Sequence, residues 1–183
     1  MKKKRTFVRY FVVLTLLALV MACASAPKQE SAGQYVDDSV ITTKVKASLT
    51  QDDVLKAFQI NVKTYKGVVQ LSGFVDSQMT IDKAGQIASG VEGVKSVKND
   101  LIMSVPKKES AGEYVDDSVI TTKVKASLTQ DAVLKAFQIN VKTYKGVVQL
   151  SGFVDSQMTI DKAGQIASGV EGVKFVKNDL LVK

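Results

Sequence analysis

The sequence predicts an α+β protein made of two tandem domains, each with two helices packed on one face of a small three-stranded sheet. The stretch from Pro27 to Ser104 recurs from Pro106 to Lys183, with an offset of 79 residues and seven differing positions. Within each copy, helical and strand-like patterns of apolar residues follow the order α-β-β-α-β. A unit of about 70 residues is long enough to build its own small core. We therefore expect two similar domains.

The ends of the two copies divide the chain. The predicted segments are a signal peptide (1–22), a polar tether (23–34), a first domain (35–104), a linker (105–113) and a second domain (114–183). Each feature of the first copy has a counterpart 79 residues later. The differing pairs are Gln29/Lys108, Gln34/Glu113, Asp53/Ala132, Ser96/Phe175, Ile102/Leu181, Met103/Val182 and Ser104/Lys183. Phe175 is the largest apolar difference and is predicted to mark a contact that only the second domain makes.

The first helix of each copy is predicted from its polar start and its apolar spacing. Asp37, Asp38 and Ser39 are N-cap candidates for a helix that continues to about Gln51. The helix face that points to the core is predicted to carry Ile41, Val45, Ser48 and Leu49.

Two strands and a tight turn are expected next. Gly67 follows Tyr65 and Lys66 and permits the turn, because glycine adopts positive φ without steric cost. The buried face of the first strand is predicted to carry Phe58, Ile60 and Val62, and that of the second strand Val69 and Leu71, ending near Gly73.

A second helix and a third strand complete the copy. Asp76 is the predicted cap of the helix, and Gly90 and Gly93 end it in a turn. The apolar positions of the helix are Ile81, Ala84, Ile87, Ala88 and Val91, and those of the strand are Val94, Val97, Leu101 and Met103.

The N-terminus has the basic head and apolar run of a secretory signal. The apolar run, Phe11 to Ala22, is shorter than the roughly 20 residues that span a bilayer. Five of the 25 basic residues and none of the 18 acidic residues precede Cys23, so residues 23–183 carry 20 basic and 18 acidic residues. The net charge of +7 belongs mostly to the signal. Nucleic acid is not an expected partner, because its binding needs a basic patch on the folded domains.

Cys23 is the only cysteine of the chain and ends the apolar run. The sequence Val20-Met21-Ala22-Cys23 fits the bacterial lipobox, in which the cysteine is acylated, for example with palmitate, and becomes N-terminal after cleavage. The alternative is ordinary signal cleavage near Ala22 to Ala26. Several acyl chains would anchor the protein stably. Ala24 after the cysteine favours the outer membrane of a Gram-negative host, with the protein on the periplasmic face.

Composition argues against an enzyme. The chain has one cysteine and no histidine, which removes intramolecular disulfides, His-based general bases and His-containing zinc sites. The paired acids Asp37/Asp38 and Asp52/Asp53 do not fit a calcium loop and are better explained as helix caps. No catalytic residue, metal or cofactor is expected.

The stretch GVVQLSGFVDS, followed by GVEGVKSVKNDL, closely resembles the BON domain of osmotically induced periplasmic proteins and related dual-BON outer-membrane lipoproteins. The matching residues are Gly67, Val69, Leu71, Gly73, Ala84, Ala88, Gly93, Val94, Val97 and Asn99, with counterparts from Gly146 to Asn178. The stretch DDSVITTKVKASL is similar to the first helix of the family. The resemblance implies an αββαβ fold and a binding role: contact with anionic phospholipid, and support of envelope integrity under osmotic or other stress. The alternative is a periplasmic holdase-like protein that binds exported or outer-membrane proteins.

The candidate lipid-contacting surface is the outward face of the first helix. An exposed valine beside lysines suits a bilayer surface with anionic headgroups. The alternative is a solvated helix face with one incidental valine. The candidate residues are Val119, Thr122, Lys123 and Lys125 in the second copy and Val40, Thr43, Lys44 and Lys46 in the first.

Several aromatic side chains are not assigned to a core by the pattern. Phe74 falls on the strand face opposite Leu71, which predicts packing between the domains or against a partner. The other aromatic residues of this kind are Tyr35, Tyr114 and Phe153. The stretch Gly90 to Gly93 has the spacing of an RNA-binding loop but holds Val and Glu instead of basic residues, which favours a plain turn.

Overall fold

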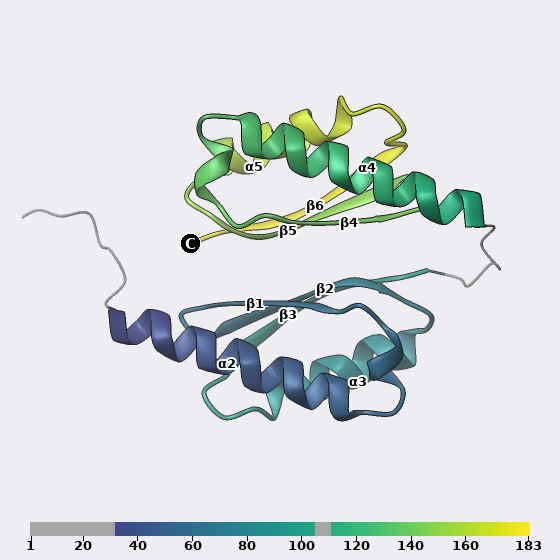
Figure 1. Ribbon diagram of the computed structural model, residues 1–183. Coiled ribbons are helices and arrows are strands. Elements are labelled where there is room, and N and C mark those ends of the chain that lie inside the picture. Colours follow the sequence, from purple (N-terminus) through teal and green to yellow (C-terminus); the bar gives the residue numbers. More distant parts are fainter. Residues whose placement is uncertain (1–31, 105–110) are drawn as a thin grey trace, which may run out of the picture. The chain divides into compact units, whose positions relative to one another are not determined.

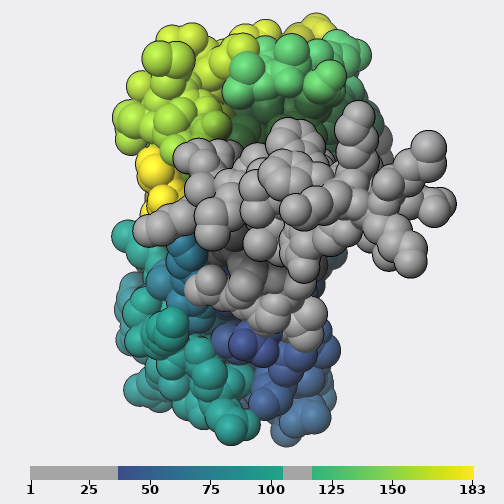
Figure 2. All heavy atoms as spheres, turned by 90° about the vertical axis from the view of Figure 1, so that its left-hand side faces the viewer, coloured from purple at the N-terminus to yellow at the C-terminus, as the bar shows by residue number. Residues whose placement is uncertain are grey.

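The structure, a computed structural model, describes residues 32–104 and 111–183. We call these ranges the first and the second repeat. Residues 32–183 belong to one compact unit. In the space-filling view of Figure 2, the first repeat, purple to teal, and the second repeat, green to yellow, each form a contiguous region of the surface. The predicted signal peptide and lipobox, with Cys23, lie outside the described residues.

Both repeats have the predicted element order, which confirms the fold class (Figure 1). The first repeat contains α2 (Ala32–Gln51), the short 3-10 helix η2 (Leu55–Ala57), β1 (Asn61–Tyr65), β2 (Val68–Val75), α3 (Gln78–Ser89) and β3 (Ser96–Met103). The second repeat contains α4 (Ala111–Gln130), η3 (Leu134–Ala136), β4 (Asn140–Tyr144), β5 (Val147–Val154), α5 (Gln157–Ser168) and β6 (Phe175–Val182).

Each sheet has its longest strands side by side. The strand order is β1-β2-β3 and β4-β5-β6, with an antiparallel first pair and a parallel second pair. Because parallel neighbours need a crossover connection, α3 and α5 link the parallel strands. The two helices of each repeat cover one face of its sheet, with α2 on β1 and α3 on β3 (Figure 1).

A closed apolar core fills the space between the helices and the sheet. In the first repeat it consists of Ile41, Val45, Leu49, Leu55, Val62, Val69, Leu71, Val75, Ala84, Ala88 and Leu101, and the second repeat buries the eleven counterparts. The predicted core-facing stripe of the first helix is therefore confirmed for Ile41, Val45 and Leu49, whereas Ser48 is half-buried and donates its hydroxyl to the carbonyl of Lys44. Phe58 and Ile60 precede β1 and pack on this core while partly exposed, because the strand begins only at Asn61. Met103 is 54% exposed and adds little to the core.

The first helix begins earlier than predicted. Since α2 starts at Ala32 and α4 at Ala111, their first turns fall in the segments assigned to the tether and the linker. The prediction that Asp37 to Ser39 cap this helix is wrong, because these residues lie inside it. Asp38 is only 7% exposed, and its carboxylate accepts hydrogen bonds from the backbone N–H groups of Lys66 (2.6 Å) and Gly67 (2.8 Å).

The second helix is capped by the residue after the predicted one. The Oγ of Ser77 accepts a hydrogen bond from the backbone N–H of Thr80 at 3.3 Å, as an N-cap does. Asp76 instead accepts the hydroxyl of Thr80 at 2.7 Å. The cap prediction for Asp76 is therefore wrong by one residue.

The helix-free faces of the two sheets contact each other through β2 and β5. Phe74 lies on this face, and its ring centroid is 5.4 Å from that of Tyr144 in the other repeat. Phe153 makes the equivalent contact with Tyr65, also at 5.4 Å. Packing between the domains, predicted for Phe74, is confirmed. Within the described ranges, no helix has the length and apolar character needed to cross a membrane.

Candidate functional site

Two of the predicted lipid-contacting residues line one depression on the second repeat. Val119 and Lys123 are four residues apart on α4, so they lie on one side of the helix, and Val119 is 44% exposed. The depression has a volume of about 360 Å³. It is lined by α4, by the turn between β4 and β5, and by the loop before β6; its residues are Asp117, Val119, Ile120, Lys123, Lys145, Gly146, Glu171, Gly172 and Lys174.

Asp117 holds the β4–β5 turn against α4. Its buried carboxylate accepts hydrogen bonds from the backbone N–H groups of Lys145 (2.6 Å) and Gly146 (2.9 Å). Both turn residues have positive φ, 53° for Lys145 and 77° for Gly146. The loop joins the same turn, since the N–H of Lys174 donates to the carbonyl of Gly146 at 2.9 Å. The backbones that carry Lys145 and Lys174 are thus fixed beside α4.

The depression has more positive than negative charge. Lys123, Lys145 and Lys174 line it with two carboxylates, and that of Asp117 is already bonded to the turn. The ammonium of Lys145 lies 5.1 Å from the ring centroid of Tyr144. Lys123 and Glu171 form an ion pair of 3.0 Å, with both side chains well exposed. Exposed pairs of this kind contribute only about 0–1 kcal/mol, so an incoming anion readily competes with Glu171. The depression can therefore hold an anionic group beside the apolar surface of Val119.

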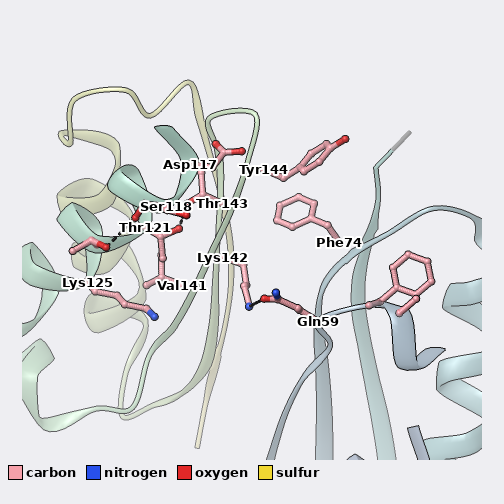
Figure 3. Close-up of a pocket in the computed structure, with 13 residues that line it drawn as sticks. Gln59, Phe74, Asp117, Ser118, Thr121, Lys125, Val141, Lys142, Thr143 and Tyr144 are labelled. Atoms are coloured by element: carbon pink, nitrogen blue, oxygen red, sulfur yellow. Dashed lines mark hydrogen bonds between the residues drawn. The ribbon is translucent and has the colours of Figure 1, made fainter. Parts of the chain in front are cut away.

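The other two predicted residues of α4, Thr122 and Lys125, do not line this depression. Thr122 and Lys125 line a groove of about 470 Å³ on the opposite side of the helix, drawn in Figure 3. The hydroxyl of Thr122 already donates to the carbonyl of Ser118 at 2.9 Å. The four predicted residues of α4 thus do not form one site.

The groove is formed by both repeats. Gln59, Phe58 and Phe74 of the first repeat line it together with α4 and β4 of the second (Figure 3). The ammonium group of Lys142 donates to Oε1 of Gln59 at 2.7 Å. Burial of Lys142, and secondarily the charge of Lys125, lowers the pKa of Lys142 below its ordinary value. Two ammonium groups, those of Lys125 and Lys142, therefore line the groove. That of Lys142 is already bonded to the neutral amide of Gln59.

The first repeat has the same arrangement as the depression on the second. Lys44 pairs with Glu92 at 3.1 Å, and Val40 is 44% exposed. Asp38 binds the β1–β2 turn that carries Lys66, and the N–H of Lys95 donates to the carbonyl of Gly67 at 2.9 Å. Thr43 donates its hydroxyl to the carbonyl of Ser39 at 2.9 Å, and Lys46 is exposed on the other side of α2.

Sequence reasoning missed the lysines of the turn and the loop, which are Lys66, Lys95, Lys145 and Lys174. Each follows or precedes a residue that the motif analysis had singled out, in Tyr-Lys-Gly and Gly-Val-Lys. A signal was therefore present, but the spacing along the chain did not connect it with the first helix.

The remaining candidates have structural partners or are exposed. The side chain of Asp52 accepts the N–H groups of Val54 and Leu55 at 3.0 and 3.1 Å and pairs with Lys83 of α3 at 2.8 Å. Phe175 is 61% exposed. Over residues 32–104 and 111–183, no group of three or more His, Cys, Asp or Glu is placed to hold a metal ion. The side chains of Tyr35 and Tyr114 lie outside the described ones.

Comparison with known proteins identifies one family and several similar proteins. Residues 37–104 and 116–183 each match the model of the BON domain. The chain is 42% identical to osmotically-inducible protein Y of Escherichia coli (strain K12), covering 97% of this chain and 100% of that protein. It is 35% identical to the outer membrane lipoprotein DolP of Haemophilus influenzae, covering 85% and 80% of the two chains. It is also 35% identical to the 21 kDa hemolysin of Actinobacillus pleuropneumoniae, covering 80% and 74%.

Proposed function

Since this chain belongs to the BON domain family and carries two copies in tandem, which confirms the resemblance found in the sequence, we propose that it is a non-enzymatic binding protein of the bacterial envelope. The relative from Escherichia coli, which is 42% identical, is named an osmotically-inducible protein. We place the role of this chain in the response to osmotic or other envelope stress. Its partners are membrane phospholipid and, secondarily, envelope proteins.

Anchoring at the outer membrane is the first part of the proposal. A relative that is 35% identical is described as an outer membrane lipoprotein, and the lipobox-like stretch ending at Cys23 supplies an acylation site. Acylation of Cys23 would hold both repeats at the periplasmic face of the membrane. Mass spectrometry of the mature N-terminus, together with membrane fractionation, tests this part. An unmodified N-terminus at Ala24 or later would refute it.

Binding of anionic phospholipid is the second part. The observation that carries it is the depression that the exposed Val119 lines together with Lys123, Lys145 and Lys174. A lysine near an anionic membrane surface contributes about 1 kcal/mol. Val119 would contact the acyl boundary while the ammonium groups contact phosphate oxygens. Two weak sites on one tethered chain gain affinity together, because binding of the second is intramolecular.

Vesicle flotation with the soluble chain from residue 24 onward tests this binding. We expect the chain to float with vesicles containing phosphatidylglycerol and to remain at the bottom with vesicles of phosphatidylcholine alone. The double variant Val119→Asp, Lys123→Glu should lower flotation severalfold. Lys135→Glu is the control for the charge reversal at Lys123, because Lys135 is exposed on η3 and does not line the depression. Equal flotation with phosphatidylglycerol and phosphatidylcholine vesicles would refute the proposal. An equal loss of flotation in the Lys135→Glu control would also refute it.

The first repeat provides a matched internal comparison. Val40→Asp with Lys44→Glu makes the same change at the equivalent residues of the first repeat. We propose that both repeats bind, so each double variant should reduce flotation and the combined variant should abolish it. If only the variant of one repeat reduces flotation, the role belongs to that repeat alone.

Partner binding is the second candidate function, favoured by exposed apolar side chains of the second repeat. Phe175 is 61% exposed and Met158 is 80% exposed. A holdase-like protein would use such side chains to cover apolar segments of exported proteins. Suppression of the aggregation of an unfolded outer-membrane protein tests it, with Phe175→Ser as the variant, because the first repeat has Ser96 at this position. Equal activity of the variant and of an unrelated domain would refute this candidate.

A further inference from the structure

The contact between the two repeats is made by the same residues on both sides. The Oγ atoms of Ser72 and Ser151 lie 2.7 Å apart, and these serines are counterparts separated by the repeat length of 79. A residue that contacts its own counterpart marks the axis of a two-fold, isologous interface. The interface is therefore self-complementary.

The hydrogen bonds around this axis are reciprocal. Oε1 of Gln70 accepts the N–H of Gly152 at 2.8 Å, and Oε1 of Gln149 accepts the N–H of Gly73 at 2.8 Å. The amide nitrogens of these glutamines donate to opposite carbonyls, each at 2.6 Å: Gln70 to Asp179, and Gln149 to Asp100. Each glutamine also donates to the carboxylate of an aspartate on its own sheet, Gln70 to Asp100 at 2.8 Å and Gln149 to Asp179 at 2.7 Å.

Burial makes these bonds necessary. Gln70 and Gln149 are 1% exposed, and Ser72 and Ser151 are 2% exposed. A buried polar group without a partner is unfavourable, so this face excludes an ordinary apolar partner. A surface with the same glutamine, serine and glycine at the same positions satisfies every group. Only another copy of this repeat offers that surface within the sequence.

The differences between the copies leave these contacts intact. None of the seven differing positions supplies one of the hydrogen bonds just described. One difference adds a contact: the ammonium of Lys183, which replaces Ser104, lies 5.4 Å from the ring centroid of Tyr65 across the interface. A pairing of two second repeats would make this contact twice, and a pairing of two first repeats would lack it.

We propose that two copies of this chain form a dimer by exchanging repeats. In this dimer, β2 of one chain packs on β5 of the other through the faces that carry Ser72 and Ser151. The exchanged dimer makes the same contacts as the single chain, so contact energy does not favour either form. A short tether gives the intramolecular pairing an effective concentration in the millimolar range. Exchange therefore requires a high local concentration, such as that of chains anchored on one membrane. This inference does not depend on lipid binding.

Cysteine cross-linking in the soluble chain from residue 24 onward tests the exchange. This chain has no other cysteine and retains the whole compact unit of residues 32–183. The Oγ separation of 2.7 Å places cysteines at positions 72 and 151 within reach of a disulfide. The variant Ser72→Cys, Ser151→Cys should form an intramolecular disulfide when it is refolded and oxidised at about 1 μM. Absence of that disulfide would refute the interface itself.

To detect exchange, two single-cysteine variants are refolded together at millimolar concentration, and the disulfide-linked dimers are measured. A mixture of isotope-labelled Ser72→Cys chains and unlabelled Ser151→Cys chains should give a dimer of mixed mass, whose yield falls at least tenfold at about 1 μM. The control is Ser168→Cys, an exposed position at the end of α5 that reports random collision. Mixed dimers no more abundant than Ser168→Cys dimers would overturn the proposal. Dimers of Ser151→Cys alone would instead show that like repeats pair, which also overturns exchange as the mode.

Discussion

The carboxylate of Asp117 on α4 accepts a 2.9 Å hydrogen bond from the backbone N–H of Gly146, which lies 29 residues further along the chain. The same carboxylate accepts the N–H of Lys145 at 2.6 Å. One buried side chain therefore fixes the position of a turn that adopts positive φ at two successive residues. This turn carries Lys145, which lines the depression together with Val119 and Lys123. Stability and the proposed binding site are linked at Asp117.

Replacing Asp117 with alanine should destabilise the second repeat. The buried N–H of Gly146 would lose its acceptor, at a cost of about 1–3 kcal/mol. Urea denaturation followed by circular dichroism measures the loss. Asp117→Asn keeps one acceptor oxygen and should cost less than Asp117→Ala. An unchanged free energy of unfolding in Asp117→Ala would contradict the role of this carboxylate.

Gly152 cannot be exchanged for alanine without strain. Its φ is +133°, and a Cβ atom there would lie 2.9 Å from the carbonyl oxygen of Gln138. Gly152→Ala should lower the free energy of unfolding by about 1–3 kcal/mol. Gly169→Ala is the matched control, because Gly169 has a φ of −78° and its nearest contacts are 3.6 Å away. The control should be neutral or stabilise the fold by about 0.4–1 kcal/mol, and an equal loss in both variants would contradict this explanation.

Neutralising the lysines that the sequence analysis missed should weaken lipid binding. Lys145→Gln and Lys174→Gln keep most of the side-chain length and remove the charge. Each should weaken binding to phosphatidylglycerol vesicles by about 1 kcal/mol, or roughly fivefold. The remaining binding should fall further as NaCl rises from 0.05 to 0.5 M, since salt screens exposed charges. Lys135→Gln should bind as the unaltered chain does, and a loss of similar size there would point to nonspecific attraction.

The carboxylate of Asp52 should make a pH-dependent contribution to the free energy of unfolding. The hydrogen bond from Lys83 lowers the pKa of Asp52 below its ordinary value of 3.8. A carboxyl group with a lowered folded-state pKa stabilises the fold above the unfolded-state pKa, and this contribution is lost as the pH falls through the folded-state pKa. Asp52→Asn should therefore be less stable than the unaltered chain at pH 7, by less than Asp117→Ala.

The difference caused by Asp52→Asn should shrink as the pH falls below about 4. Urea midpoints measured between pH 2 and pH 7 provide the comparison. Asp131→Asn should behave in the same way, because Lys162 likewise lowers the pKa of Asp131. A difference that stays constant down to pH 2 would show that the ionised carboxylate is not the cause.

Local patterns in the sequence were sufficient for the fold because each core face is encoded along a single element. Ile41, Val45 and Leu49 are spaced for one side of a helix, and all three are buried. Val69 and Leu71 alternate along β2 and are fully buried. These spacings follow from the helical and strand periods and need no tertiary information. The repeat itself was visible as an offset of 79 residues.

Predictions of helix caps were less accurate, because an aspartate carboxylate can accept N–H groups of its own helix or of a distant turn. Asp38 has the sequence context of an N-cap, yet it lies within α2 and binds the turn at Gly67. That partner is 29 residues away. No local pattern distinguishes an aspartate that caps its own helix from one that accepts N–H groups of a distant turn.

The sequence by itself determined the two repeats, the order of their helices and strands, most residues of each core and the resemblance to the family. The tertiary structure alone decided that Lys145 and Lys174 join Val119 and Lys123, while Thr122 and Lys125 line another groove. It also decided that Ser72 contacts its own counterpart, Ser151. The physical reason is that periodicity fixes the side of an element on which a residue lies, whereas a site is made by residues that chain reversal and sheet packing bring together from distant positions.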